Sequence, residues 1–209
     1  MSNNTIKKKD SSIDLNNYIK SLISLMKPRV MSLVIFTCAV GLLTSNSNIS
    51  IFNAMTCIIF VALGSGAAGC LNMWYESDVD ALMTRTCLRP IPTGKINKDQ
   101  ALVFGILLTI ISVSALNYFA NFLSAFLLFF TIAFYLFVYT IWLKRKTPQN
   151  IVIGGVAGSL PPVIGWSIAT NSISLASLSL FLIIFFWTPS HFWALSLYKA
   201  DDYKKARIP

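Results

Sequence analysis

Charged residues are scarce in this 209-residue sequence and make up only 12% of it. A soluble globular domain carries about 25% charged residues, so this composition excludes an ordinary soluble fold. Hydrophobic residues make up 55% of the chain, and the mean hydropathy is +0.66. These values are typical of a protein that lies in a membrane.

Other residue types and patterns are missing as well. The four cysteines form no CxxC pair, so neither a disulfide framework nor a zinc site is predicted. No apolar run follows directly after the basic residues near the N-terminus, because Asp10, Asp14 and several Asn and Ser intervene, so we do not expect a signal peptide. We predict a disordered cytoplasmic tail at 1–20, followed by a membrane domain at 21–209.

Long apolar runs dominate the rest of the chain. About 20 apolar residues are needed to cross the ~30 Å hydrocarbon core of a bilayer as a helix. The sequence contains six candidate spans of roughly this length, at 28–45, 51–71, 101–119, 121–143, 151–169 and 175–198. We therefore predict an all-α, polytopic membrane helix bundle.

The 17 lysines and arginines are confined to four places. These are the N-terminal tail, the loop from Arg85 to Lys98, the segment 144–146 and the end of the chain; three other connections carry no charge. Six spans would place the four charged segments on one side of the membrane. The positive-inside rule then predicts that both termini are cytoplasmic. Scattered basic loops suit a lipid bilayer and give no indication of nucleic-acid binding.

Acidic residues are few, yet three of the eight follow the second apolar run in "NMWYESDVD". In a continuous helix Asn72, Glu76 and Asp80 share one stripe, because each step of four residues rotates by about 40°. Asp78 lies off that stripe. Two carboxylates and an amide can hold Mg²⁺ together with substrate phosphates. The alternative is a solvated loop, but ionisable groups at the end of a span favour a functional site.

Basic residues follow the acids closely. Arg85, Arg89 and Lys95 suit the oxygens of a diphosphate, and arginine can bind them with two hydrogen bonds. Acids on a helix with basic residues in the next loop predict a metal–diphosphate site.

The acidic segment resembles the first aspartate-rich motif of the UbiA superfamily of intramembrane prenyltransferases. More closely, it resembles the protoheme IX farnesyltransferases, also called haem O synthases. The similarity runs from about residue 25 to the last residue and includes "LMKPRVMSLVIFT", "LKRKTPQNIVIGGVAGSLPPVIGW" and "WTPSHFWALSLYKADDYKKARIP".

The resemblance implies a UbiA-type helix bundle that uses Mg²⁺ and farnesyl diphosphate. An allylic cation would be attacked by a vinyl group of the substrate haem B, giving haem O. Asn72, Glu76 and Asp80 match the first motif, although its middle position is usually Asp. Asp202 matches the second motif, with Asp201 as its neighbour. The implied metal ligands are Glu76, Asp80 and Asp202.

Three further residues are candidates for substrate binding. His191 is the only histidine, and it can ligate haem iron or orient a carboxylate; the alternative is a packing role. Trp193 can stack on a porphyrin or lie at the membrane interface. Lys144 can reach the diphosphate or anchor the end of a span.

Members of the family usually have nine spans, and about six are present here. We therefore expect a domain that is incomplete at its C-terminus and that makes little haem O alone. A bacterial inner membrane is the expected location. A haem A synthase, or a chain that supplies the missing helices, is a further candidate partner. Alternative functions are prenylation of a quinone precursor, a non-catalytic relic and an assembly partner of a haem–copper oxidase.

Overall fold

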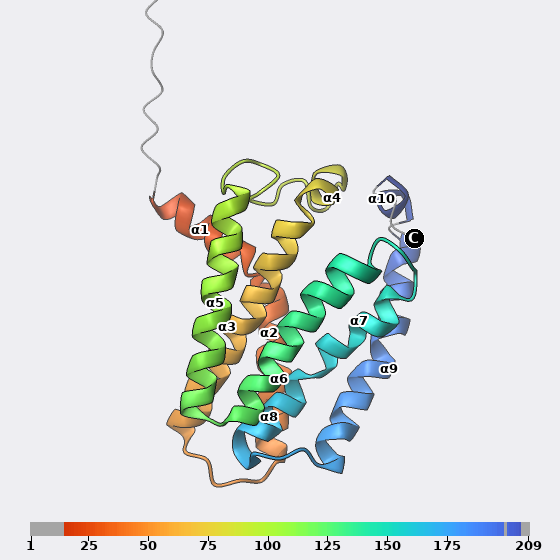
Figure 1. Cartoon of the computed structure of the whole chain (residues 1–209). Helices are drawn as coiled ribbons and strands as arrows, with labels where there is room; N and C mark the ends of the chain where they lie inside the picture. Colours follow the sequence, from red (N-terminus) through yellow and green to blue (C-terminus); the bar gives the residue numbers. More distant parts are fainter. Residues whose placement is uncertain (1–14, 199, 206–209) are drawn as a thin grey trace, which may run out of the picture.

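The computed structural model describes residues 15–198 and 200–205, with the backbone alone at 195 and 201–203. The described part is almost entirely helical and contains no strand. The elements in chain order are α1 (Leu15–Leu25), α2 (Pro28–Thr44), α3 (Ile51–Tyr75), α4 (Ser77–Leu82), α5 (Lys98–Phe119), α6 (Phe122–Ala133), the π-helix η1 (Phe134–Leu143), α7 (Asn150–Ser159), α8 (Pro161–Thr170), α9 (Leu175–Tyr198) and α10 (Ala200–Lys205). The long helices run side by side as one bundle (Figure 1).

The predicted spans are confirmed as helices of the bundle. Five of the helical segments are long and apolar enough to cross a membrane, namely α3, α5, α6 with η1, α7 with α8, and α9. Helices α1 and α2 would form a sixth span if this pair, bent by 51°, were counted together. Large apolar side chains cover the outside of the bundle, as a surface in contact with lipid requires.

Local sequence explains where several helices begin. Pro28 is the first residue of α2, and Pro161 is the first residue of α8. Proline has no backbone N–H to donate, and it is tolerated here because the N–H groups of the first helical turn have no acceptor within the helix. The side chain of Ser50 caps α3 by accepting a hydrogen bond from the amide of Asn53, and Asn121 caps α6 in the same way.

The tail predicted at 1–20 needs one correction. Residues 15–20 form the first part of α1, whose partly buried Tyr18 and Leu22 pack against the core. This apolar contact stabilises a helix in a segment that looks polar in the sequence. Residues 1–14 lie outside the described part of the chain.

The charged connections gather at one end of the bundle. Helix α4, the loop that follows it and α10 lie at this end, together with the turn between η1 and α7 (Figure 1). The uncharged connections at 45–50, 120–121 and 171–174 lie at the opposite end (Figure 1). The charged and uncharged connections therefore lie at opposite ends of the bundle, as the sequence predicts.

We predict that the uncharged end faces away from the cytoplasm. In a variant whose four native cysteines are replaced by serine, a cysteine at Asn48 should react with an impermeant maleimide only from the periplasmic side. A cysteine at Lys146 is the matched control and should react only from the cytoplasmic side. Labelling of Asn48→Cys from the cytoplasm alone would contradict this orientation.

Candidate active site

The acidic segment crosses a break between two helices. Helix α3 ends at Tyr75, and Glu76 takes a non-helical conformation with φ −91° and ψ 11° before α4 begins. The continuous helix on which the predicted stripe was based is therefore interrupted at Glu76. Hydrogen bonds from the amide of Glu76 to the Asn72 carbonyl (3.0 Å) and from the amide of Asp80 to the Glu76 carbonyl (2.8 Å) still continue the helical path.

The predicted stripe survives this break. Asn72, Glu76 and Asp80 are almost completely buried, with 1%, 2% and 3% of their surface exposed. Asp78 points away, and 61% of its side chain is exposed. The sequence prediction that Asp78 is separate from the other three residues is confirmed.

Glu76 pairs with Lys144, which follows the last residue of η1. The Lys144 ammonium lies 2.6 Å from each carboxylate oxygen of Glu76. Burial disfavours the charged form of Lys144, but Tyr139 and Glu76 outweigh this effect and raise the lysine pKa. Lys144, for which the sequence allowed either diphosphate binding or anchoring of a span, thus lies directly on the acidic stripe and carries its charge.

Asp80 pairs with Arg89 from the loop after α4. One guanidinium nitrogen of Arg89 donates to both carboxylate oxygens, at 2.8 and 2.7 Å. The loop is held close because the buried Thr86 hydroxyl donates to the backbone carbonyl of Asp80 at 2.9 Å. Arg89 is therefore the member of the predicted basic set that reaches the buried acids.

Asp78 has a different partner on the surface. Arg145 donates to both of its oxygens, at 3.0 and 2.8 Å. Partial burial favours the neutral acid, but the hydrogen bonds from Arg145 outweigh it and lower the pKa of Asp78. The pair is solvent-exposed, so we expect it to contribute little to stability.

Asn72 connects three elements through its side-chain amide. Its oxygen accepts a hydrogen bond from the Lys27 ammonium, and its nitrogen donates to Glu76 (2.8 Å) and to the hydroxyl of Thr140 (3.1 Å). The Thr140 hydroxyl in turn donates to the Tyr135 carbonyl at 2.9 Å, five residues earlier, within the π-helix. Irregular helical turns of this kind are frequent at functional sites.

The sequence analysis missed Lys27. This residue lies between α1 and α2 in the left-handed conformation, with φ 55°, and directs its ammonium to the buried stripe. It interacts electrostatically with Glu76, Asp80, Arg89 and Lys144. A lysine between two apolar stretches, directly before proline, was a signal that could have identified it.

Several predicted substrate-binding residues are not brought to this cluster. Within the described residues, the exposed side chain of Arg85 makes no hydrogen bond or ion pair, and exposed Lys95 lines a pocket beside α1. His191 lies on the exposed surface of α9 and stacks on Trp187, with ring centroids 4.3 Å apart. Trp193 on the same helix is 46% exposed. The roles of these residues remain predictions.

The predicted second acidic motif falls on α10. The side chains of Asp201 and Asp202 lie outside the described part of the structure, so their roles also remain predictions. Among the described side chains, no group of three acidic, histidine or cysteine residues is placed to hold a metal. The donors present are the oxygens of Glu76 and Asp80.

These residues nevertheless fit a magnesium–diphosphate unit. Here the almost completely buried Asn72, Glu76 and Asp80 meet three partly buried basic side chains, those of Lys27, Arg89 and Lys144. Magnesium is usually held by one or two carboxylates together with substrate phosphates. The basic side chains suit the phosphate oxygens, while the carboxylates suit the metal. We call these six residues the polar cluster.

The fold and the polar cluster define a class of membrane protein, and comparison with known proteins identifies it. Residues 33–209 match the UbiA prenyltransferase family, and the chain belongs to that family. It is an integral, multi-pass membrane protein.

More particular similarity is found among bacterial relatives. The chain is 75% identical to the protoheme IX farnesyltransferase of Pelagibacter ubique (strain HTCC1062), across 90% of this chain and 62% of that protein. It is 58% identical to the protoheme IX farnesyltransferase 2 of Mesorhizobium japonicum, across 89% of this chain and 59% of the relative. The chain thus spans about three-fifths of the length of these relatives.

Solved structures support the fold. A UbiA homolog from Archaeoglobus fulgidus bound to DMAPP and Mg²⁺ has a TM-score of 0.70 to this chain at 18% identity. The match covers 90% of this chain and 67% of the homolog. The structure bound to GPP and Mg²⁺ gives a TM-score of 0.67 at 20% identity, covering 89% and 66% of the two chains.

Proposed function

We propose that this chain carries the diphosphate-binding part of a protoheme IX farnesyltransferase. The reaction is transfer of the farnesyl group of farnesyl diphosphate to a vinyl group of haem B, which yields haem O. The observation that carries the proposal is the 75% identity to the Pelagibacter ubique enzyme, over a segment that includes the entire polar cluster. The charge of that cluster supports the same chemistry.

The basic residues bind and orient the diphosphate in this proposal. Lys27, Arg89 and Lys144 exchange their contacts with Asn72, Asp80 and Glu76 for contacts with phosphate oxygens. Charge-assisted hydrogen bonds of this kind are about twice as strong as neutral ones. They hold the leaving group at the polar end of the bundle, while the apolar helices accommodate the isoprenoid chain.

Glu76 and Asp80 would hold magnesium, with Asp202 as the third proposed ligand. When bound, the metal neutralises the negative charge that develops on the diphosphate. The bond between farnesyl carbon and diphosphate oxygen breaks, and its electron pair leaves with the diphosphate. The vinyl group of haem B then forms the new carbon–carbon bond, which leaves a positive charge on its other carbon. Water adds to that carbon and releases a proton, which leaves the hydroxyl group. Apolar helices protect the allylic cation because they exclude other water.

The test is haem analysis in a bacterial strain that lacks its own synthase. The chain is expressed alone and also joined to the part of the Pelagibacter ubique relative that lies outside the matched segment. We expect chromatography of extracted haems to show haem O from the joined protein. The 209-residue chain alone should give little, as the sequence analysis predicts.

The Pelagibacter ubique relative itself is the positive control for expression and for haem O detection. Absence of haem O from a well-expressed joined protein would contradict the proposal if the relative produces it. Accumulation of a prenylated quinone precursor instead would favour the alternative UbiA activity.

A further inference from the structure

Helix α1 has two apolar surfaces, of which only one is packed against the protein. Tyr18, Leu22 and Leu25 contact the small core formed by Cys70, Met73, Ile96 and Ala101. Leu15, Ile19 and Ile23 instead form an exposed stripe, with 68%, 46% and 51% of their surface accessible. These three residues are four apart, so they lie on one face of the helix. We call them the α1 stripe.

The orientation of α1 separates this stripe from the outer wall of the bundle. The axis of α1 is bent by 51° from that of α2, and the helix lies obliquely at the charged end (Figure 1). An amphipathic helix with this placement is typical of the interface between lipid headgroups and hydrocarbon. The stripe is thus positioned to contact acyl chains.

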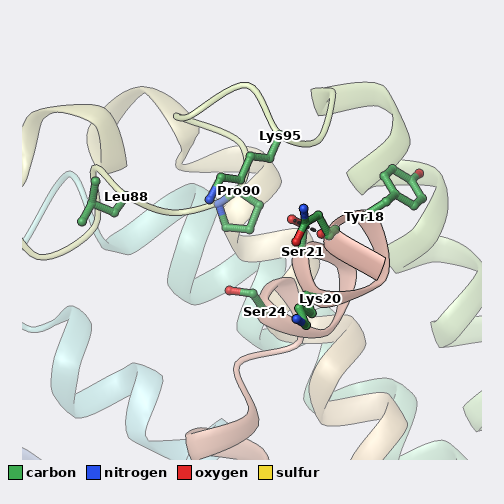
Figure 2. Close-up of a pocket in the computed structure, with 8 residues that line it drawn as sticks. Tyr18, Lys20, Ser21, Ser24, Leu88, Pro90 and Lys95 are labelled. Carbon is green, nitrogen blue, oxygen red and sulfur yellow. Dashed lines mark hydrogen bonds between the residues drawn. The ribbon is translucent and has the colours of Figure 1, made fainter. Parts of the chain in front are cut away.

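A pocket lies on the polar side of the same helix. Its volume is about 600 Å³. Its walls come from α1 and from the loop between α4 and α5 (Figure 2), and it is lined by Asn17, Tyr18, Lys20, Ser21, Ser24, Leu88, Pro90 and Lys95. The lining contains two lysines and no acidic residue, so it is complementary to an anion. We call it the basic pocket.

Lys20 connects the basic pocket to the α1 stripe. Each helical residue rotates by about 100°, which places Lys20 between Ile23 and Ser24 on the helix surface. Ile23 belongs to the stripe and Ser24 lines the pocket. Both Lys20 and Lys95 are exposed, and neither forms an ion pair within the described residues. A single ligand can therefore contact the lysines with an anionic group and the stripe with an apolar one.

We propose that the basic pocket and the α1 stripe bind one anionic phospholipid. The lipid phosphate lies between Lys20 and Lys95, the hydroxyls of Ser21 and Ser24 face the headgroup, and an acyl chain follows Leu15, Ile19 and Ile23. A small soluble anion would use the lysines but not the stripe. The lipid would link α1 to the loop whose Arg89 pairs with Asp80. This inference does not depend on the proposed transferase chemistry.

The experiment is native mass spectrometry of the purified chain in neutral detergent with equal amounts of phosphatidylglycerol and phosphatidylcholine. We expect retention of phosphatidylglycerol over phosphatidylcholine, because a lysine near anionic lipid contributes about fivefold to affinity. The double variant Lys20→Ser, Lys95→Ser should bind both lipids equally. Replacement of both lysines by arginine should keep the preference.

The control is Lys204→Ser, Lys205→Ser, which removes the same charge from two exposed lysines of α10. This control variant should keep the preference for phosphatidylglycerol. The variant Ile19→Ser, Ile23→Ser, which makes the α1 stripe polar, should weaken retention of phosphatidylglycerol. An unchanged preference in the Lys20, Lys95 variant would overturn the proposal. If the Lys20→Ser, Lys95→Ser variant lost binding of inorganic diphosphate but kept its preference for phosphatidylglycerol, this result would also overturn the proposal and would assign the pocket to the substrate. Circular dichroism verifies folding in each case.

Discussion

Replacement of Asp80 by alanine is expected to abolish most magnesium-dependent diphosphate binding, whereas replacement of Asp78 should leave it nearly unchanged. Asp80 lies buried in the polar cluster and pairs with Arg89. Loss of a carboxylate that binds a charged group should cost at least about 1.5–3 kcal/mol, or roughly 10- to 150-fold in affinity. Asp78 is exposed and pairs only with Arg145 at the surface.

The measurement is calorimetric titration of the purified protein with inorganic diphosphate, with and without Mg²⁺. Asp80→Ala also leaves the partly buried Arg89 without its partner, and a lost partner of this kind can destabilise a fold by about 3–5 kcal/mol. Asp80→Asn therefore serves as a second variant that keeps the side-chain shape. Equal effects of the Asp78 and Asp80 substitutions, in proteins that remain folded, would contradict the assignment of Asp80 to the metal–diphosphate site.

Replacement of either glycine at the contact between α2 and α8 should strongly destabilise the bundle. A Cβ atom at Gly41 would lie 1.9 Å from the Pro162 carbonyl oxygen, and one at Gly165 would lie 1.9 Å from the Cys38 carbonyl oxygen. Both obstacles are backbone atoms, so the two helices must move apart. Inserting a methyl group into a packed interface typically costs about 1–3 kcal/mol, and a backbone clash places these sites at or above that range.

The neighbouring helix α7 offers a matched control for this prediction. A Cβ atom at Gly158, near the end of α7, would meet no heavy atom within 4 Å. Gly158→Ala should be neutral or should stabilise the protein by about 0.5–1 kcal/mol, because alanine loses less backbone entropy in a helix. Thermal unfolding in detergent compares the three single variants. A melting temperature of Gly41→Ala or Gly165→Ala equal to that of Gly158→Ala would show that the helices are not in such close contact.

The helices themselves were largely predictable from the sequence. A helix in a bilayer satisfies its backbone hydrogen bonds within its own segment, so a run of apolar residues is enough to indicate it. The predicted span at 121–143 corresponds to the observed pair Phe122–Ala133 and Phe134–Leu143, and the span predicted at 175–198 corresponds to Leu175–Tyr198. The span predicted to end at residue 71 extends to Tyr75, because polar Asn72 is buried in the bundle.

Part of the site was also predictable, because it depends on local periodicity. Residues four apart share a helix face, and this rule separated Asp78 from Asp80 correctly even though the chain bends at Glu76. The break does not disturb the stripe because the backbone hydrogen bonds continue from Asn72 through Asp80. Short-range geometry was sufficient for this part of the polar cluster.

Composition and periodicity alone determined that this protein is an all-helical membrane bundle with a buried acidic stripe at its charged end. Only the tertiary structure decided which cations reach that stripe. Lys27 and Lys144 are 45 and 68 residues away from their partners Asn72 and Glu76, and Arg89 was indistinguishable from Arg85 and Lys95 in the sequence. The physical reason is that an ion pair between distant segments depends on how whole helices pack, which no local pattern of residues encodes.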